Sequence, residues 1–255
     1  VLDLSGRFEI EFKNVSFKYP GAENYALQNV NLKIKNGEHL AVVGRSGRGK
    51  TTFIKLMCRL YDVTDGEILI NGINIKDYTK DSIIKLYSVV FQDFKIFSTT
   101  LKENVCASGD FDEGRFYACL ENADIKERTE RMPNKESTYL YKDLDENGVE
   151  ISGGEAQKLA LARALYKDAP IVVLDEPTAA LDPIAENEIY SRFNTFVQGK
   201  TAIYISHRLS SCAFCDKIAV FNNAKLAETG THKDLLSAGG KYAELWNAQA
   251  KYYIQ

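Results

Sequence analysis

The sequence predicts an α/β protein, and three observations support this fold class. A short run of apolar residues at 40–43 is followed at once by a glycine-rich turn and then by a helix with one apolar face. A continuous apolar run is typical of a strand that is covered on both faces in a parallel sheet. Two further runs of this kind occur at residues 171–174 and 202–205. Strand, glycine turn and helix in this order open an α/β fold.

The chain before this unit predicts strands of a different kind. Residues 8–12 and 30–34 alternate between apolar and polar side chains, as in strands with one buried face. The turn-forming sequence Tyr-Pro-Gly at 19–21 separates them. We therefore expect an antiparallel β-subdomain at the N-terminus.

The helices are predicted from their apolar period. After the glycine turn, the apolar side chains fall at i, i+3, i+4 and i+7, which places them on one buried face. These side chains are Phe53, Leu56, Met57 and Leu60. Between about 94 and 148 the pattern changes, and helical stretches at 101–107 and 113–123 alternate with polar loops. We expect a helical subdomain inserted into the α/β core.

Composition narrows the class of protein. The 255 residues are 45% hydrophobic, which is enough to bury a core, and the formal net charge of -3 predicts no nucleic-acid partner. No apolar run is long enough to span a bilayer, and no signal-peptide pattern opens the chain. The odd count of five cysteines indicates a reducing compartment, and we expect Cys212 and Cys215 to be buried free thiols. The start at Val1 suggests a piece of a longer protein.

The glycine turn fits the phosphate-binding pattern G-x-x-x-x-G-K-[ST] at every position. Its residues are Gly44, Arg45, Ser46, Gly47, Arg48, Gly49, Lys50 and Thr51. Backbone amides in such a turn point at phosphate oxygens, and the helix that follows adds a favourable dipole. Lys50 supplies a positive charge for the outer phosphates, and Thr51 supplies a hydroxyl for Mg²⁺. A chance glycine turn would not be expected between a buried strand and an amphipathic helix, so the sequence predicts an ATP site.

Two carboxylates follow the apolar run at 171–174, namely Asp175 and Glu176. Ligands of open parallel sheets bind at the carboxyl ends of the strands, beside the phosphate loop. Asp175 can then hold Mg²⁺, and Glu176 can orient and polarise the attacking water. The alternative is that the two carboxylates only form a polar strand end before Pro177. The complete phosphate loop upstream favours a role at the nucleotide instead.

A second glycine motif, at residues 151–155, opens a helix. Ser152 and Glu155 form a capping box, which is a structural explanation of the motif. Gly153 and Gly154, however, are poor helix formers in a first helical turn. Two amides without side chains at a helix N-terminus make a second anion site. Because this site has no lysine, we expect it to serve a neighbouring molecule.

With these motifs the chain resembles the ATP-binding cassette of ABC transporters over nearly its whole length, residues 1–255. The matches stand in the order of that family: the phosphate loop from Gly44 to Thr52, the Q-loop glutamine Gln92, the signature at 151–157, the pair Asp175 and Glu176, the D-loop aspartate Asp182, and the switch histidine His207. Tyr19 stands in the place of the aromatic residue that stacks on adenine. The resemblance implies a P-loop NTPase core with a mixed sheet, an N-terminal antiparallel β-subdomain and a helical subdomain inserted at about 94–165.

The resemblance also implies how the site works. Two cassettes would form a head-to-tail dimer around two ATP molecules, with Ser152, Gly153 and Gly154 acting on the neighbour's ATP. Gln92 would touch Mg²⁺ and water and couple the site to a membrane domain. His207 would contact the γ-phosphate, whereas His39 and His232 are expected to be structural.

Several segments resemble cassettes of the exporter type, namely 92–98, Glu103 with Asn104, 206–210, and the ending from 230 to 245. In that type the cassette follows its transmembrane domain in the same chain, at the cytoplasmic face of the cell membrane. The chain carries one complete set of motifs, which favours a homodimer over a heterodimer.

Three positions depart from the common pattern of the family, namely Arg48, Ile151 and Glu155. A small residue is usual at position 48, and glutamine is usual at position 155. We expect Arg48 to reach the partner's signature and pair with Glu155 there. The alternative is that Arg48 points into solvent and Glu155 only completes its capping box.

Three other functions are alternatives to export powered by ATP hydrolysis. A DNA-repair or chromosome clamp would need a long coiled coil between Gln92 and Ile151, where no sustained heptads occur. A soluble translation-factor ATPase would carry two cassettes in one chain. A regulatory cassette that binds ATP with little hydrolysis is kept open by Arg48, although Glu176 and His207 argue against it.

Overall fold

The computed structural model describes residues 6–44, 49–107, 110–176, 194, 197–206, 209 and 213–253. By its contacts the chain divides into two compact units. The first unit consists of Val1–Tyr87, Pro170–Asp175 and Gly199–Gln255, and the second of Ser88–Ala169 and Glu176–Gln198.

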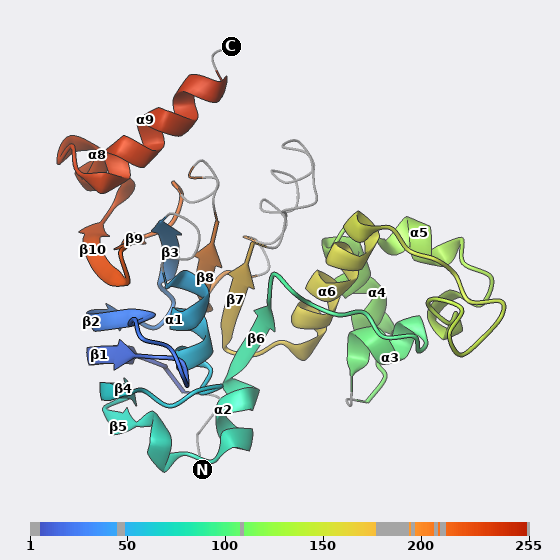
Figure 1. Cartoon of the computed structure of the whole chain (residues 1–255). Coiled ribbons are helices and arrows are strands. Elements are labelled where there is room, and N and C mark those ends of the chain that lie inside the picture. The colour runs from blue at the N-terminus through green and yellow to red at the C-terminus, as the bar shows by residue number, and fades with distance from the viewer. Residues whose placement is uncertain are drawn as a thin grey trace. The chain divides into compact units, whose positions relative to one another are not determined.

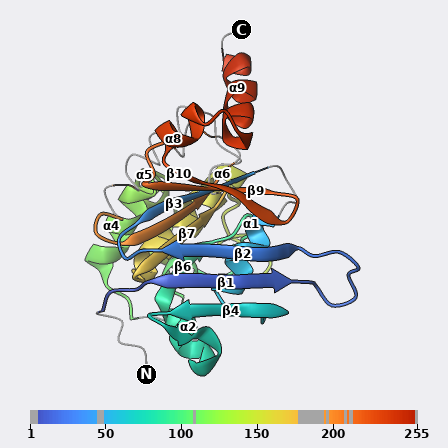
Figure 2. The same ribbon diagram turned by 90° about the vertical axis from the view of Figure 1, so that its left-hand side faces the viewer.

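An antiparallel sheet forms the N-terminal part of the first unit, with strand order β2-β1-β4-β5. Its strands are β1 (Ile10–Phe17), β2 (Leu27–Ile34), β4 (Asp65–Ile70) and β5 (Ile73–Asn74). Figure 2 shows β2, β1 and β4 side by side. Phe12 of β1 is paired with Leu32 on one side and with Ile68 on the other, and all three are buried. The predicted strands at 8–12 and 30–34 belong to this sheet, although the first of them begins at Ile10.

A second sheet holds the three apolar runs that define the fold class. Within the first unit its strand order is β10-β9-β3-β8-β7. The strands are β3 (His39–Gly44), β7 (Ile171–Asp175), β8 (Thr201–Ile205), β9 (Lys217–Asn222) and β10 (Lys225–Gly230). Strands β9, β3, β8 and β7 are mutually parallel (Figure 1), whereas β10 is antiparallel to β9. The sheet is therefore mixed, as predicted.

Helix α1 (Lys50–Met57) packs against both sheets. The Phe53 ring stacks on Phe12 of β1 at 4.4 Å and lies 5.5 Å from the Phe221 ring of β9. The prediction that Leu60 continues the buried face of this helix was wrong. The backbone at Arg59 has φ 53, a left-handed conformation that ends the helical course, and Leu60 is 53% exposed.

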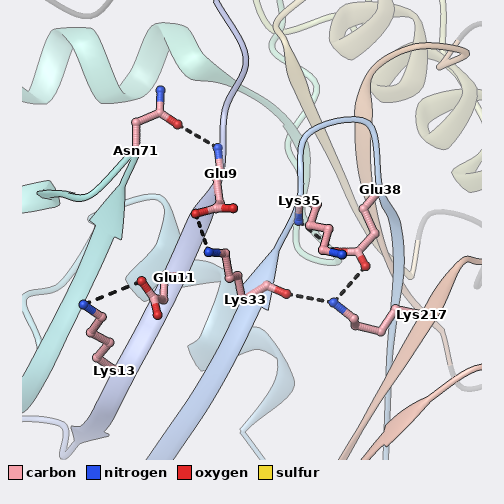
Figure 3. A network of polar contacts seen from close by, with 8 residues as sticks. All are labelled: Glu9, Glu11, Lys13, Lys33, Lys35, Glu38, Asn71 and Lys217. Carbon is pink, nitrogen blue, oxygen red and sulfur yellow. Dashed lines mark hydrogen bonds and ion pairs between the residues drawn. The ribbon is translucent and has the colours of Figure 1, made fainter.

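Charged side chains connect the two sheets of the first unit, as Figure 3 shows. The Lys33 ammonium of β2 pairs with Glu9 at 2.7 Å. Lys217, the first residue of β9, donates to the backbone carbonyl of Lys33 at 2.9 Å and pairs with Glu38 at 2.8 Å. One lysine at the start of a parallel strand thus joins the antiparallel sheet to the turn that leads into β3.

Further helices lie in the described part of the first unit. They are η1 (Ile75–Asp77), α2 (Lys80–Leu86), α8 (His232–Ser237) and α9 (Lys241–Tyr253). His232 has the structural role expected of it, because its Nδ1 lies 2.7 Å from the Tyr242 hydroxyl and its ring packs edge-on against Trp246.

The second unit is mainly helical. Strand β6 (Tyr87–Val90) crosses the boundary into it, and its helices are α3 (Leu101–Cys106), α4 (Glu113–Asn122), α5 (Lys126–Glu130), η2 (Lys135–Ser137) and α6 (Gly153–Lys167). The helices predicted at 101–107 and 113–123 are confirmed. Arg163 of α6 holds both α3 and the segment before it, because its guanidinium donates to the carbonyl of Asn104 in α3 at 2.6 Å and to that of Lys95 at 3.0 Å.

The described cysteines are Cys58, Cys106, Cys119 and Cys215, and all four are buried free thiols. Cys212 lies outside the described residues. Within the part of the chain that the structure describes, no cluster of histidine, cysteine and carboxylate side chains could hold a metal ion. Among the same residues, no helix combines the length and apolar character that crossing a membrane requires.

Candidate nucleotide-binding site

The two ends of the predicted phosphate loop require glycine. Gly44 has φ 147, and a Cβ there would lie 2.3 Å from the backbone oxygen of Phe221. Gly49 has φ 100, and a Cβ there would lie 2.7 Å from the Leu27 side chain and 2.8 Å from the oxygen of Ala26. Both positions therefore combine a backbone conformation that favours glycine with a space too small for a side chain.

The centre of the loop, consisting of Arg45, Ser46, Gly47 and Arg48, lies outside the described residues. The predicted pairing of Arg48 with a partner's Glu155 consequently stays a prediction.

The Lys50 side chain returns to the first residue of the loop. Its ammonium donates to the carbonyl of Gly44 at 2.8 Å, and the residue is only 5% exposed. Lys50 is also the first residue of α1, whose N-cap Gly49 has no side chain to accept from the first amides. The positive charge and the uncapped amides of the helix therefore lie at the same end of β3, where an anion is stabilised.

The sheet register brings Asp175 to the same edge as the loop. Asp175, the last residue of β7, pairs across to Ile205 of β8, which pairs with Val42 of β3. Strands are spaced about 4.8 Å apart, so Asp175 lies level with Val42 at about 10 Å. Gly44 stands two residues further along β3. The buried Asp175, 1% exposed, thus lies at the carboxyl end of the sheet beside the start of the phosphate loop.

An aromatic group flanks α1. The Tyr19 hydroxyl lies 3.1 Å from the Thr52 hydroxyl, which ties the tyrosine to the first turn of the helix. The Tyr19 ring packs edge-on against Phe17 at 4.9 Å and against Tyr61 at 5.3 Å. Tyr19 and Thr51 are both partly exposed, which leaves them accessible to a ligand.

The other described candidates belong to the second unit. Gln92 is exposed in a turn that follows β6. Glu176 has φ 52, a left-handed conformation that is uncommon outside glycine, and its carbonyl accepts from the Gln157 amide at 3.4 Å. The predicted site residues Asp182 and His207 lie outside the described residues.

The signature segment forms the N-terminus of α6. Ser152 is its N-cap, and its hydroxyl accepts from the Glu155 amide at 3.2 Å, while a Glu155 carboxylate oxygen accepts from the Ser152 amide at 2.8 Å. This is the predicted capping box. Ser152 and Gly153 are exposed, and a Cβ on Gly153 would meet nothing within 4 Å. The first turn of α6 therefore faces open space.

Sequence reasoning missed one residue near this segment. Arg128 of α5 donates from Nε to the second carboxylate oxygen of Glu155 at 2.7 Å. The two residues are 27 positions apart in different helices, so no periodicity or motif spacing signals the contact.

The fold and this loop together define a nucleotide-binding α/β domain. The sequence profile described as "ABC transporter" matches residues 27–179 of the chain. The chain therefore belongs to the ABC transporter family, in which it is the ATP-binding and ATP-hydrolysing domain.

Known relatives are of the exporter type. The chain is 40% identical over 243 residues to the ATP-dependent lipid A-core flippase of Burkholderia orbicola (strain AU 1054), which covers 95% of this chain and 40% of that protein. It is 39% identical over 241 residues to the flippase of the same name from Escherichia coli (strain K12), covering 94% of this chain and 41% of that protein. The chain thus spans about two-fifths of the length of these curated relatives.

A solved structure of an ABC exporter has the same fold as this chain. The structure of a bacterial Atm1-family ABC exporter with ATP bound superimposes with a TM-score of 0.90 at 36% identity, over 98% of this chain and 43% of that one. The resemblance to exporter-type cassettes that the motifs indicated is confirmed.

Proposed function

We propose that the chain hydrolyses ATP with Mg²⁺ through the residues that the sequence motifs single out. The observation that carries the proposal is the carboxyl edge of the second sheet, where the buried Lys50 follows strand β3 and the buried Asp175 ends the parallel strand β7. Lys50 would hold the outer phosphates. The amides from Gly44 to Thr52 would bind the phosphate oxygens, as loops of this pattern do.

The donor set fits a magnesium ion. The Thr51 hydroxyl, the Asp175 carboxylate and the Gln92 amide offer the oxygen ligands that Mg²⁺ prefers in proteins. When bound, the ion would neutralise charge on the phosphates. Tyr19 would stack on the adenine ring.

Glu176 would activate the water molecule that attacks ATP. Its carboxylate would accept a proton from the water whose oxygen attacks the γ-phosphorus, and the bond to the bridging oxygen would break to release ADP. His207 would contact the γ-phosphate. The position of Glu176 directly after the buried Asp175, at the carboxyl end of β7, supports this assignment.

The signature segment would complete the site of a second cassette. Ser152, Gly153, Gly154 and Glu155 stand at an open helix N-terminus that has no lysine of its own. A head-to-tail dimer, with Asp182 at the interface, would place this anion site on the partner's ATP. We propose a homodimer, since the chain carries both halves of such a composite site.

The dimer would power export. The relatives named above are a flippase and an exporter, and this chain covers 40% of the flippase and 43% of the exporter chain. We therefore propose that the cassette works with a transmembrane domain of the same transporter, at the cytoplasmic face of the cell membrane. Gln92, just before the helical subdomain at about 94–165 of the domain 1–255, would couple the site to that transmembrane domain.

Two substitutions test the assignment of roles. Lys50→Ala is expected to abolish ATPase activity by lowering ATP affinity at least about tenfold, because Lys50 contacts the phosphates before reaction. Glu176→Gln is expected to abolish hydrolysis while ATP affinity changes less than about threefold, since it acts on the water. ATP titration and phosphate release on the same preparations measure both effects.

Equal losses of ATP affinity in the two variants would contradict the role given to Glu176. ATP binding without measurable hydrolysis in the unmodified chain would instead favour a regulatory cassette.

A further inference from the structure

The first turn of α6 contains both a proposed anion-binding site and a carboxylate side chain. Its first residue, Gly153, is exposed with open space around it, and amides at an open helix N-terminus suit an anion. Glu155, in the same turn, brings a carboxylate. A negative charge next to a phosphate weakens binding through like-charge repulsion.

The capping box keeps this carboxylate in place. One oxygen of Glu155 accepts from the Ser152 amide at 2.8 Å, so the side chain is held against the helix N-terminus. The box stabilises the helix. It also prevents the charge from turning away into solvent.

Arg128 engages the other oxygen. Its Nε donates to Oε1 of Glu155 at 2.7 Å, which is the length of a charge-assisted hydrogen bond. The arginine comes from a well-anchored turn, because the next residue, Thr129, is 1% exposed and donates to the carbonyl of Lys126 at 2.7 Å. Both oxygens of Glu155 therefore have partners within the second unit.

The neighbouring cations are engaged with other carboxylates. Lys158, one turn further along α6, pairs with Asp124 at 2.6 Å. Arg131, the residue after α5, pairs with Glu127 at 3.3 Å. Within the described residues, Arg128 is the cation that contacts Glu155.

The ion pair between Arg128 and Glu155 compensates the charge of the carboxylate and contributes little to folding stability. The two side chains are 38% and 25% exposed, and exposed ion pairs contribute little to stability. Burial raises the pKa of Glu155, but hydrogen bonds from Ser152 and Arg128 bring this pKa below its ordinary value. Glu155 is thus a carboxylate at neutral pH, and its charge requires compensation.

We propose that Arg128 is a positioning residue of the nucleotide site: it neutralises Glu155, so that the N-terminus of α6 accepts the terminal phosphate of a nucleotide held by a second copy of the chain. The proposal rests on the proposed function, because it concerns the same signature segment. It also supplies a cation for Glu155 from within the chain, where the sequence suggested the partner's Arg48.

The test uses ATP-driven association of the Glu176→Gln chain, measured by light scattering against protein concentration. Arg128→Gln removes the charge and keeps a side chain of polar character. We expect it to weaken association about tenfold, the scale of one charge interaction near a protein surface. Adding Glu155→Gln should restore association, because the uncompensated carboxylate is gone. Arg128→Lys should retain association, since it keeps the charge.

Arg131→Gln is the matched control. Arg131 lies next to α5 and loses the same charge on substitution, but it pairs with Glu127 and both side chains are exposed. Association should be unchanged in this variant. The melting temperatures of Arg128→Gln and Arg131→Gln should differ by less than about 3 °C.

The outcomes separate the inference from the function on which it rests. A Glu176→Gln parent that fails to associate with ATP overturns the proposed dimer and the role of Arg128 with it. A parent that associates, with Arg128→Gln unchanged, overturns the role of Arg128 alone. A loss in Arg128→Gln that Glu155→Gln does not restore also overturns it, because Arg128 would then only support α5. Restoration by Glu155→Gln of a defect in Arg48→Ser, with none in Arg128→Gln, assigns the compensating cation to Arg48.

Discussion

At the scale of the residue, position 49 requires glycine for two reasons, its backbone conformation and the lack of space for a side chain. Its φ of 100 is disfavoured for any residue with a side chain, and the space for a Cβ is taken by Leu27 and by the carbonyl of Ala26. A methyl group there must move the backbone between β3 and α1. That segment carries the amides that are proposed to bind phosphate.

We predict that Gly49→Ala lowers ATP affinity at least about tenfold, because displaced amides no longer converge on the phosphates. Gly37→Ala is the matched control. Gly37 also has a positive φ, 74, but a Cβ there would meet nothing within 4 Å. Gly37→Ala should cost about 1 kcal/mol of folding stability and leave ATP affinity unchanged. Isothermal titration with ATP and urea unfolding measure the two effects, and equal affinity losses in both variants would contradict the steric argument.

The phosphate loop could be predicted from its sequence because its contacts are local. Gly44, Gly49 and Lys50 lie within seven positions, and the lysine returns to the carbonyl of Gly44. The pairing of Arg128 with Glu155 could not be predicted, because it depends on how two helices pack. Lys217 is a similar case, since its partners Lys33 and Glu38 lie in distant strands and turns.

At the scale of the element, α3 and α6 begin in the same way. Each has a complete capping box, formed by Thr100 with Glu103 in α3 and by Ser152 with Glu155 in α6. The local chemistry is equivalent, so the two caps should stabilise their helices to a similar extent. Only the cap of α6 belongs to the proposed anion site. Substitutions in the two caps can therefore separate an effect on ATP-driven association from an effect on stability.

We predict that Thr100→Ala and Ser152→Ala each lower the free energy of unfolding by about 1 kcal/mol, the usual value of an N-cap side chain. Only Ser152→Ala should also weaken ATP-driven association of the Glu176→Gln chain, because its hydroxyl faces the proposed partner. Urea unfolding and light scattering on the same two variants measure this. Equal weakening of association by Thr100→Ala would show that the effect comes from loss of stability.

The prediction of elements succeeded where the apolar period was long or the run was continuous. Strands β3, β7 and β8 consist almost entirely of buried apolar residues, and periodic helices such as α4 carry their own signal. It failed at Leu60, because the left-handed turn at Arg59 ends α1 before the apolar period does. Strand β10 was not predicted, since it is an edge strand without a fully buried face and owes its position to pairing with β9.

At the scale of the whole molecule, association must overcome like charge. Each copy of the chain has a formal net charge of -3, and bound ATP adds more negative charge. Non-specific electrostatics therefore opposes a dimer. Attraction has to come from specific contacts between the phosphates and two sets of amides, one at the phosphate loop and one at the signature segment.

We predict that the 255-residue chain is monomeric without nucleotide and that the Glu176→Gln variant dimerises in ATP but not in ADP. The γ-phosphate is the group that both loops would share, and ADP lacks it. Light scattering should give twice the monomer mass for this variant in ATP, and Lys50→Ala in the same background should remain monomeric because it cannot hold the nucleotide. A stable dimer without nucleotide would contradict an interface made by ATP. Binding of duplex DNA at physiological salt would point instead to a chromosome clamp, since such binding depends on phosphate contacts that this chain's net charge does not favour.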